Sequence, residues 1–266
     1  MSVWIAFLLT AAAGLSTGIG GAISLFTKST NKKFLAVSLG FSAGVMIYVS
    51  MVELFASAQQ YLTAEYGGKM GLLYAILSFF GGILLIAVID KAIPEKDNPH
   101  ECVGLDGEAL DECRRKNNLM RSGVLTALAI AIHNFPEGLA TFVSALQAYE
   151  VAIPIVVAIA IHNIPEGISV AVPIYHATKS KAKAFWLSLL SGMAELLGAV
   201  IGYLILMPFM SNAVYGIVFG IIAGIMVYIS LDELLPSAGK YGEHHLGIYG
   251  LVAGMALMAF SLWLFV

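Results

Sequence analysis

Eight long apolar stretches constrain the fold of this 266-residue chain more than any other feature. They cover approximately residues 3–26, 34–57, 70–89, 122–147, 151–174, 184–206, 213–235 and 246–266. About 20 apolar residues let an α-helix cross a lipid bilayer, whereas a strand of a membrane β-barrel needs only about 10. The stretches are too long for barrel strands. We therefore predict an all-α integral membrane protein with eight transmembrane helices, forming a single domain over residues 1–266.

The composition supports this class and excludes an ordinary soluble protein. Charged residues make up 12% of the chain, whereas soluble domains contain about 25%. The lipid bilayer is therefore the expected partner, and the net charge of −3 gives no reason to expect a nucleic-acid partner. The one long polar segment, residues 91–121, contains Cys102 and Cys113 and is predicted to be a cytoplasmic loop. We expect the two cysteines to be an ordinary solvated pair, with a disulfide in the loop or a weak metal contact as the alternatives.

The basic residues predict the orientation of the chain in the membrane. Of the 14 Lys and Arg residues, 13 follow the first, third, fifth or seventh stretch, and only Lys69 falls on the other side. Loops rich in Lys and Arg stay in the cytoplasm. With eight crossings, both termini are then expected outside the cytoplasm.

An internal repeat relates residues 40–58 to residues 220–238, with ten of 19 positions identical at an offset of 180. The identical positions include Met46 with Met226, Tyr48 with Tyr228, and Glu53 with Glu233. The two segments cross the predicted membrane in opposite directions, which is typical of the inverted repeats of secondary transporters. We predict a 3+2+3 arrangement in which helices 1–3 are related to helices 6–8. The alternative, two glycine-rich packing helices of similar composition, does not explain the shared methionine and glutamate.

A block of the form His-Asn-x-Pro-Glu-Gly occurs twice, at residues 133–138 and 162–167, and Ala-Ile-Ala-Ile precedes both copies. Each histidine lies about 11 or 12 residues into its helix, roughly 17 Å deep and near the midplane of a ~30 Å hydrocarbon core. Glu195 lies at a similar depth in the sixth helix. Ionisable groups at such depth are costly and mark functional sites.

The spacing inside each block suits metal binding. An α-helix turns about 100° per residue, so Glu137 lies between His133 and Asn134 on the helix surface and can share one ion with each. The same geometry holds for the second block, which contributes His162, Asn163 and Glu166. Imidazole nitrogen and carboxylate oxygen suit Zn²⁺, Fe²⁺, Mn²⁺ and Co²⁺. A hydrogen-bonded core histidine, a glutamate proton relay or a proline kink explains each residue alone, but none of them explains two identical blocks.

Other residues are candidates for the path that a metal ion takes through the membrane. Glu195 either completes the shell of a second ion or is a protonated packing residue, and Met46 is either a thioether ligand or part of the core. Glu53 and Glu233 are candidate entrance and exit carboxylates. Four more residues are predicted near the cytoplasmic opening of the path, which we call the inner mouth. They either form the exit path for metal or are simply solvated helix ends: Asp90, Asp232, His244 and His245.

On these motifs the chain resembles the ZIP family of divalent-metal transporters, and one bacterial branch of it most closely, over essentially the whole length. The resemblance implies eight helices in a 3+2+3 arrangement, a homodimer and a multi-pass location in the bacterial inner membrane. It also implies a site for two ions. The ligands implied for the first ion are Met46, His133, Glu137, His162 and Glu166. Those implied for the second are Asn134, Glu137, Asn163, Glu166 and Glu195.

We therefore predict an importer of divalent cations that works by alternating access, with helices four and five in the moving bundle. The expected cargo is Zn²⁺, with a range that includes Fe²⁺, Mn²⁺, Co²⁺ and Cd²⁺, and no catalytic cofactor is expected. A proton-coupled metal exporter is the first alternative, because the repeat permits either direction. An intramembrane metal hydrolase is a second alternative, but the chain lacks His-Glu-x-x-His and an evident additional base. A metal-responsive receptor is a third, disfavoured by the short loops.

Overall fold

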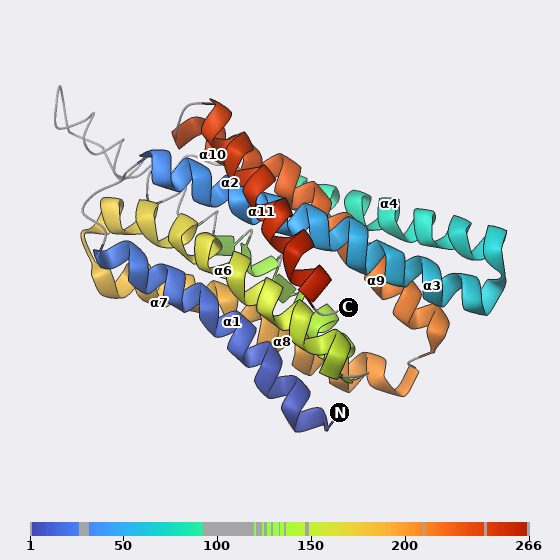
Figure 1. The fold of residues 1–266 in the computed structure, drawn as a ribbon. Helices are drawn as coiled ribbons and strands as arrows, with labels where there is room; N and C mark the ends of the chain where they lie inside the picture. The colour runs from blue at the N-terminus through green and yellow to red at the C-terminus, as the bar shows by residue number, and fades with distance from the viewer. Residues whose placement is uncertain are drawn as a thin grey trace.

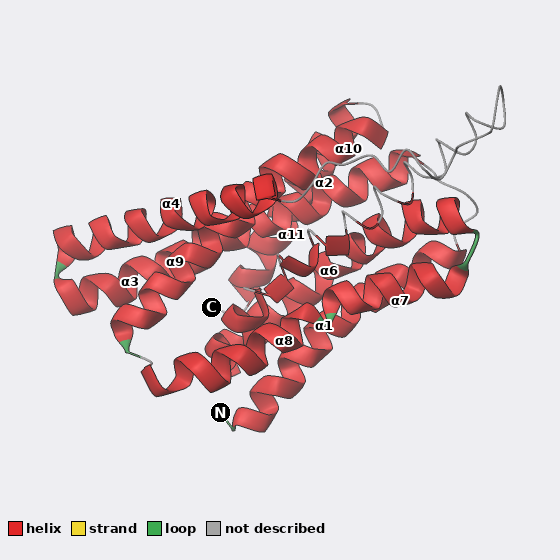
Figure 2. Ribbon diagram, turned by 180° about the vertical axis from the view of Figure 1, so that it is seen from behind, coloured by secondary structure: helices red, strands yellow, loops and turns green. Residues whose placement is uncertain are grey.

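The computed structural model describes residues 2–26, 32–92, 149–209, 211–241 and 244–264, together with 120, 124, 127, 128, 130–132, 134, 135 and 137–146. Within these residues the chain is helical apart from short turns and helix ends, and no strand occurs (Figures 1 and 2). The predicted all-α class is therefore confirmed for the described part of the chain. Cys102 and Cys113, in the predicted cytoplasmic loop, lie outside the described residues.

The labelled helices follow one another with few interruptions. They are α1 (Val3–Phe26), α2 (Lys32–Val49), α3 (Phe55–Tyr66), α4 (Gly68–Ala92), α6 (Tyr149–Thr178), α7 (Lys181–Gly192), α8 (Ala194–Ile201), α9 (Asn212–Ile229), α10 (Leu235–Tyr241) and α11 (His244–Leu264). Residues 137–146 are also helical. Short π-helical turns follow α2 (Ser50–Leu54), α8 (Gly202–Leu206) and α9 (Ser230–Leu234), and a 3-10 turn covers Met207–Phe209.

Six helices in the described part of the chain are long and apolar enough to cross a membrane. These are Val3–Ile23, Ala36–Tyr66, Gly68–Ile89, Lys181–Ile205, Asn212–Asp232 and His245–Trp263. Large apolar side chains such as Leu84 and Val252 are exposed on the outward faces of α4 and α11. A contiguous apolar exterior of this kind suits lipid rather than water. These features support a multi-pass membrane protein, and the count of eight crossings stays a prediction.

The helices pack into two groups (Figure 1). In the first, which we call the α1 group, α1 packs against α6, α7 and α8. The helix at residues 137–146 joins this group, because the ring of Phe142 packs on that of Phe7 in α1 at a centroid distance of 4.6 Å. In the second, the α2 group, α2 packs against α10 and α11, and α9 packs against α3 and α4. Among the described elements, the two groups meet chiefly where α2 lies against α6.

Close helix contacts in the α2 group recur at the offset of the sequence repeat. A Cβ atom added to Gly44 would collide with the backbone of Leu251 in α11, so these two helices touch at their backbones. A Cβ atom added to Gly224, 180 residues after Gly44, would likewise collide with the backbone of Phe79 in α4. Small residues at such crossings let membrane helices approach closely. The two repeated helices therefore use equivalent glycines to pack against different neighbours.

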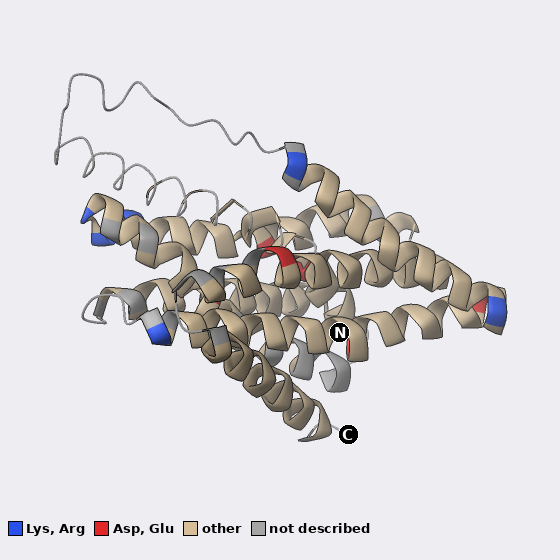
Figure 3. Cartoon of the chain, turned by 90° about the horizontal axis from the view of Figure 1, so that it is seen from above, with Lys and Arg blue, Asp and Glu red and all other residues tan. Residues whose placement is uncertain are grey.

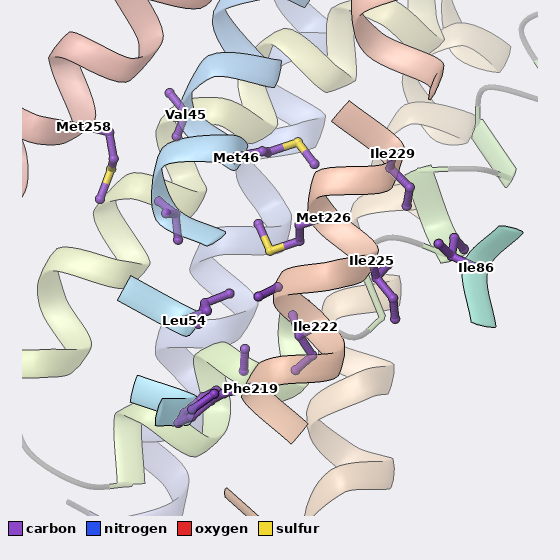
Figure 4. Packing of buried hydrophobic residues seen from close by; sticks show 14 of the residues in the cluster. Val45, Met46, Leu54, Ile86, Phe219, Ile222, Ile225, Met226, Ile229 and Met258 are labelled. Atoms are coloured by element: carbon purple, nitrogen blue, oxygen red, sulfur yellow. The ribbon is translucent and has the colours of Figure 1, made fainter. Parts of the chain in front are cut away.

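The two π-helical turns at Ser50–Leu54 and Ser230–Leu234 also match. The Ser50 hydroxyl donates to the Met46 carbonyl at 2.6 Å, and the Ser230 hydroxyl donates to the Met226 carbonyl at 2.7 Å. The two methionine side chains are fully buried in one hydrophobic cluster. Figure 4 shows them extending from α2 and α9 into the space between these helices. The repeat is therefore present in local structure as well as in sequence.

Candidate metal site

Five polar residues singled out by the sequence are buried inside the bundle. Asn134, Asn163, Glu166 and Glu195 are 0% exposed, and Glu137 is 1% exposed. They come from the segment around residues 130–146, from α6 and from the first turn of α8. Figure 3 shows acidic residues at mid-length of the bundle, whereas basic residues appear only at helix ends. A buried charge so far from water must be compensated by a partner.

A break between α7 and α8 positions Glu195. The chain makes a turn at Met193, so Glu195 lies in the first turn of a new helix and carbonyls of the preceding turn are accessible to other donors. The Asn134 side-chain amide donates to one of them, the Ser191 carbonyl, at 3.2 Å. A Cβ atom added to Gly138 would collide with the Glu195 backbone, so the glycine of the first block allows this close approach.

Asn163 connects the second block to two other helices. Its side-chain nitrogen donates to the Ala13 carbonyl of α1 at 3.1 Å and to Oε1 of Glu195. With the nitrogens of both asparagines engaged in this way, their Oδ1 atoms are left as acceptors. Among the residues that the structure describes, no hydrogen-bond donor reaches Oδ1 of Asn134, Oδ1 of Asn163 or Oε2 of Glu195. Buried oxygens without a donor are unfavourable, and a cation would satisfy them.

The carboxylates of the two blocks lie on elements that pack against the start of α8. Asn163, three residues before Glu166 in α6, donates to Glu195, and Gly138, next to Glu137, packs against the Glu195 backbone. Three buried carboxylates repel one another unless protons or cations compensate their charge. Buried carboxylate and amide oxygens are ligands that divalent cations accept, which is consistent with the predicted site.

The α2 group also contributes to this region. Ser42, which is fully buried in α2, donates from Oγ to Oε1 of Glu166 at 3.2 Å. Oγ of Ser42 also lies 4.0 Å from the sulfur of Met46. The predicted thioether ligand and a predicted carboxylate ligand therefore come from different helix groups and meet around one serine hydroxyl.

Comparison with known proteins identifies the family. The sequence profile described as ZIP zinc transporter matches residues 90–262 of this chain. The chain belongs to the ZIP zinc transporter family. A relative of this ZIP chain, the zinc transporter ZupT of Streptococcus mutans serotype c, is 63% identical over 261 residues, covering 98% of this chain and 97% of the relative. ZupT of Clostridium perfringens is 58% identical over 277 residues, covering 100% and 97%. The predicted family is thus confirmed.

Some of the residues predicted for the ZIP site lie beyond what the structure describes. His133 is outside the described residues, and His162 lies in α6 with a side chain that is not described. The same holds for the side chains of Asp90, Glu233 and His244. The side chains that are described, which include neither block histidine, contain no group of three or more His, Cys, Asp or Glu suited to hold a metal ion. The ligand set therefore stays a prediction.

The remaining described candidates for the metal path of this ZIP protein are more exposed than the buried carboxylates. Glu53 is half-buried in the first π-helical turn, and Asp232 is exposed in the second. His245 is exposed near the start of α11, where its ring stacks on Tyr249 at a centroid distance of 6.3 Å. Sequence reasoning missed Ser42. One difference between the two copies of the repeat could have identified it, because the position is a polar Ser42 in the first copy and an apolar Ile222 in the second.

Proposed function

We propose that this ZIP protein imports divalent metal ions, chiefly Zn²⁺, into the cytoplasm. The observation that carries the proposal is the burial of Glu137, Glu166 and Glu195 together with two asparagine oxygens that lack donors among the described residues. Relatives that are named zinc transporters align with nearly the whole chain. Because the family is one of transporters, the protein is not an enzyme.

The chain crosses the bacterial inner membrane eight times as one domain over residues 1–266. Its helices follow a 3+2+3 order with an inverted repeat, both termini lie outside the cytoplasm, and segment 91–121 lies in the cytoplasm. The distribution of basic residues and the equivalent glycine contacts in α2 and α9 support this arrangement. The protein forms a homodimer, as the family resemblance implies.

Two ions bind side by side at mid-membrane. The first ion takes ligands from Met46 and from the block histidines, His133 and His162. The second takes ligands from Glu195 and from the block asparagines, Asn134 and Asn163. Glu137 and Glu166 bridge the two ions. These protein atoms replace water ligands that the ion loses on leaving solution, which offsets the cost of dehydration. Imidazole and carboxylate ligands also admit Fe²⁺, Mn²⁺, Co²⁺ and Cd²⁺.

Transport proceeds by alternating access as the α1 group moves against the α2 group. Among the described elements the two groups meet chiefly where α2 lies against α6, and we expect the relative motion to change the packing at this contact. Metal enters past Glu53 and leaves through the inner mouth. The residues of that mouth are Asp90, Asp232, Glu233, His244 and His245.

Zinc uptake into proteoliposomes that contain purified protein and an enclosed zinc indicator tests the proposal. Glu137→Ala and Glu166→Ala should each reduce the initial rate to that of protein-free vesicles, since each removes a bridging carboxylate. Glu65→Ala is the matched control, because this glutamate is exposed at the end of α3. Uptake at the wild-type rate by Glu166→Ala, at equal reconstituted protein, would refute the assignment of the site.

The direction of transport is tested separately in cells. Expression of the wild-type chain should raise total cellular zinc, and Glu166→Ala should abolish the increase. A fall in cellular zinc on expression would instead indicate the proton-coupled exporter.

A further inference from the structure

The hydroxyl of Ser42 contacts groups from both parts of the candidate site. It donates to Oε1 of Glu166 in α6 at 3.2 Å and lies 4.0 Å from the sulfur of Met46 in its own helix. The side chain is 0% exposed. A hydrogen bond between a buried hydroxyl and a buried carboxylate is stronger than one between neutral groups.

The internal repeat supplies a comparison within the same chain. In α9, Ile222 occupies the position that Ser42 has in α2, and it packs in the main hydrophobic cluster. The fold of the repeated helix therefore accepts an apolar side chain at this position. The hydroxyl occurs in the copy that faces Glu166, which associates it with the carboxylate rather than with helix packing.

Other buried serines of the repeat bond differently. Ser50 and Ser230 donate to carbonyls four residues earlier in their own helices, which is a common local arrangement for serine in a helix. The bond from Ser42 to Glu166 instead joins residues that are 124 positions apart in the sequence and lie in different helix groups. Its removal therefore takes away a hydrogen bond that joins the two helix groups.

We propose that Ser42 is a positioning residue of the metal site, which holds the Glu166 carboxylate in the orientation that binds metal. This inference rests on the proposed function, because it takes Glu166 to be a metal ligand. A carboxylate has about four acceptor positions, so one oxygen can receive the hydroxyl while a metal uses the rest. Hydrogen-bond partners of metal ligands fix their orientation, and losing one costs about 10- to 100-fold in metal affinity.

The test compares Ser42→Ala, Ser42→Thr and the control Ser230→Ala, each purified and checked for monodisperse elution and thermal unfolding. Zn²⁺ binding is measured by equilibrium dialysis and uptake in proteoliposomes. Ser42→Ala should weaken zinc binding about tenfold and raise KM to a similar extent, with Vmax within about twofold of wild type. Ser42→Thr keeps the hydroxyl and should bind zinc like wild type. Ser230→Ala should also match wild type, since it loses only a bond within its own helix.

Wild-type zinc affinity and KM in Ser42→Ala would overturn the inference, as would equal losses in folded Ser42→Ala and Ser42→Thr. If Ser42→Ala does not fold, Ser42→Gly replaces it, because glycine also lacks the hydroxyl and is common at contacts between membrane helices. That variant should bind zinc more weakly than wild type, and unchanged binding overturns the inference.

A Glu166→Ala arm separates failure of this inference from failure of the proposed function. If Glu166→Ala stops uptake while Ser42→Ala behaves as wild type, only the role of Ser42 is wrong. If Glu166→Ala transports zinc normally, the proposed site itself is wrong, and with it the role of Ser42.

Discussion

At the scale of single residues, Asn163 illustrates how a neutral side chain can become an oxygen ligand. Its nitrogen is held by the Ala13 carbonyl and by Glu195, which fixes the amide and leaves Oδ1 as the remaining polar atom. Asn134 is fixed in the same way through the Ser191 carbonyl. Each amide is therefore oriented before any ion binds, which reduces the entropy that binding must overcome.

Replacing Asn163 should remove one of the two proposed ions. Asn163→Ala loses the Oδ1 ligand and the donor to Glu195, so we expect the protein to bind one Zn²⁺ instead of two at saturation. Equilibrium dialysis with metal analysis of the purified protein measures this ratio. Asn212→Ala, at the exposed start of α9, is the control. An unchanged ratio and affinity in Asn163→Ala would show that this amide is not a ligand.

The burial of the block carboxylates was predictable, and their hydrogen-bond partners were not. Repetition and depth predicted one site for Glu137, Glu166 and Glu195; in the structure all three are buried, and the ligand set stays a prediction. The Ala13 carbonyl could not be predicted, because every residue carries a backbone carbonyl and only packing selects one. Ser42 carries no motif, since hydroxyls are common in membrane helices.

At the scale of helices, the observed helix ends depend on local sequence features that the pattern of apolar residues does not reveal. The helix that contains α2 continues through a π-helical turn to Tyr66, well beyond the predicted end at residue 57, because the polar residues after that point still favour helix. Conversely, the stretch 184–206 contains a break at Met193 that has no proline to announce it. Hydropathy locates a span but does not resolve interruptions inside it.

Adjacent glycines in α4 offer a controlled test of helix packing. A Cβ atom at Gly82 would collide with the backbone of Ile221 in α9, whereas a Cβ atom at Gly81 would meet nothing within 4 Å. We expect Gly82→Ala to lower the thermal unfolding temperature in detergent, because α4 and α9 must move apart. Gly81→Ala has the same chemical change and should leave the temperature unchanged or raise it, since alanine favours a helix by about 0.5–1 kcal/mol.

Equal unfolding temperatures for the two alanine variants would contradict backbone contact between α4 and α9. The same comparison extends to the repeat, where Gly44→Ala should behave like Gly82→Ala because its Cβ would meet the backbone of Leu251.

At the scale of the whole molecule, the site couples metal binding to stability. If the proposed site binds Zn²⁺, it does so only in the folded protein, because only folding brings its residues together. Zinc at a hundredfold excess over Kd should therefore stabilise the protein by about 2.7 kcal/mol. Thermal unfolding with added zinc and after chelation measures the difference.

Variants locate the source of that stabilisation. The shift in unfolding temperature on adding zinc should be lost in Glu166→Ala and retained in Glu65→Ala. A shift of equal size in all three proteins would mean that zinc stabilises the fold from a different place.

The contact between α2 and α6 has a consequence for the rate of transport. Met46 lies in the α2 group and Glu166 in the α1 group. An ion coordinated by both residues would link the two groups, so the groups could separate only after a metal–ligand bond dissociates. Turnover should then be limited by how fast each cation exchanges its ligands. Cations with slow ligand exchange would bind well yet act as inhibitors of transport.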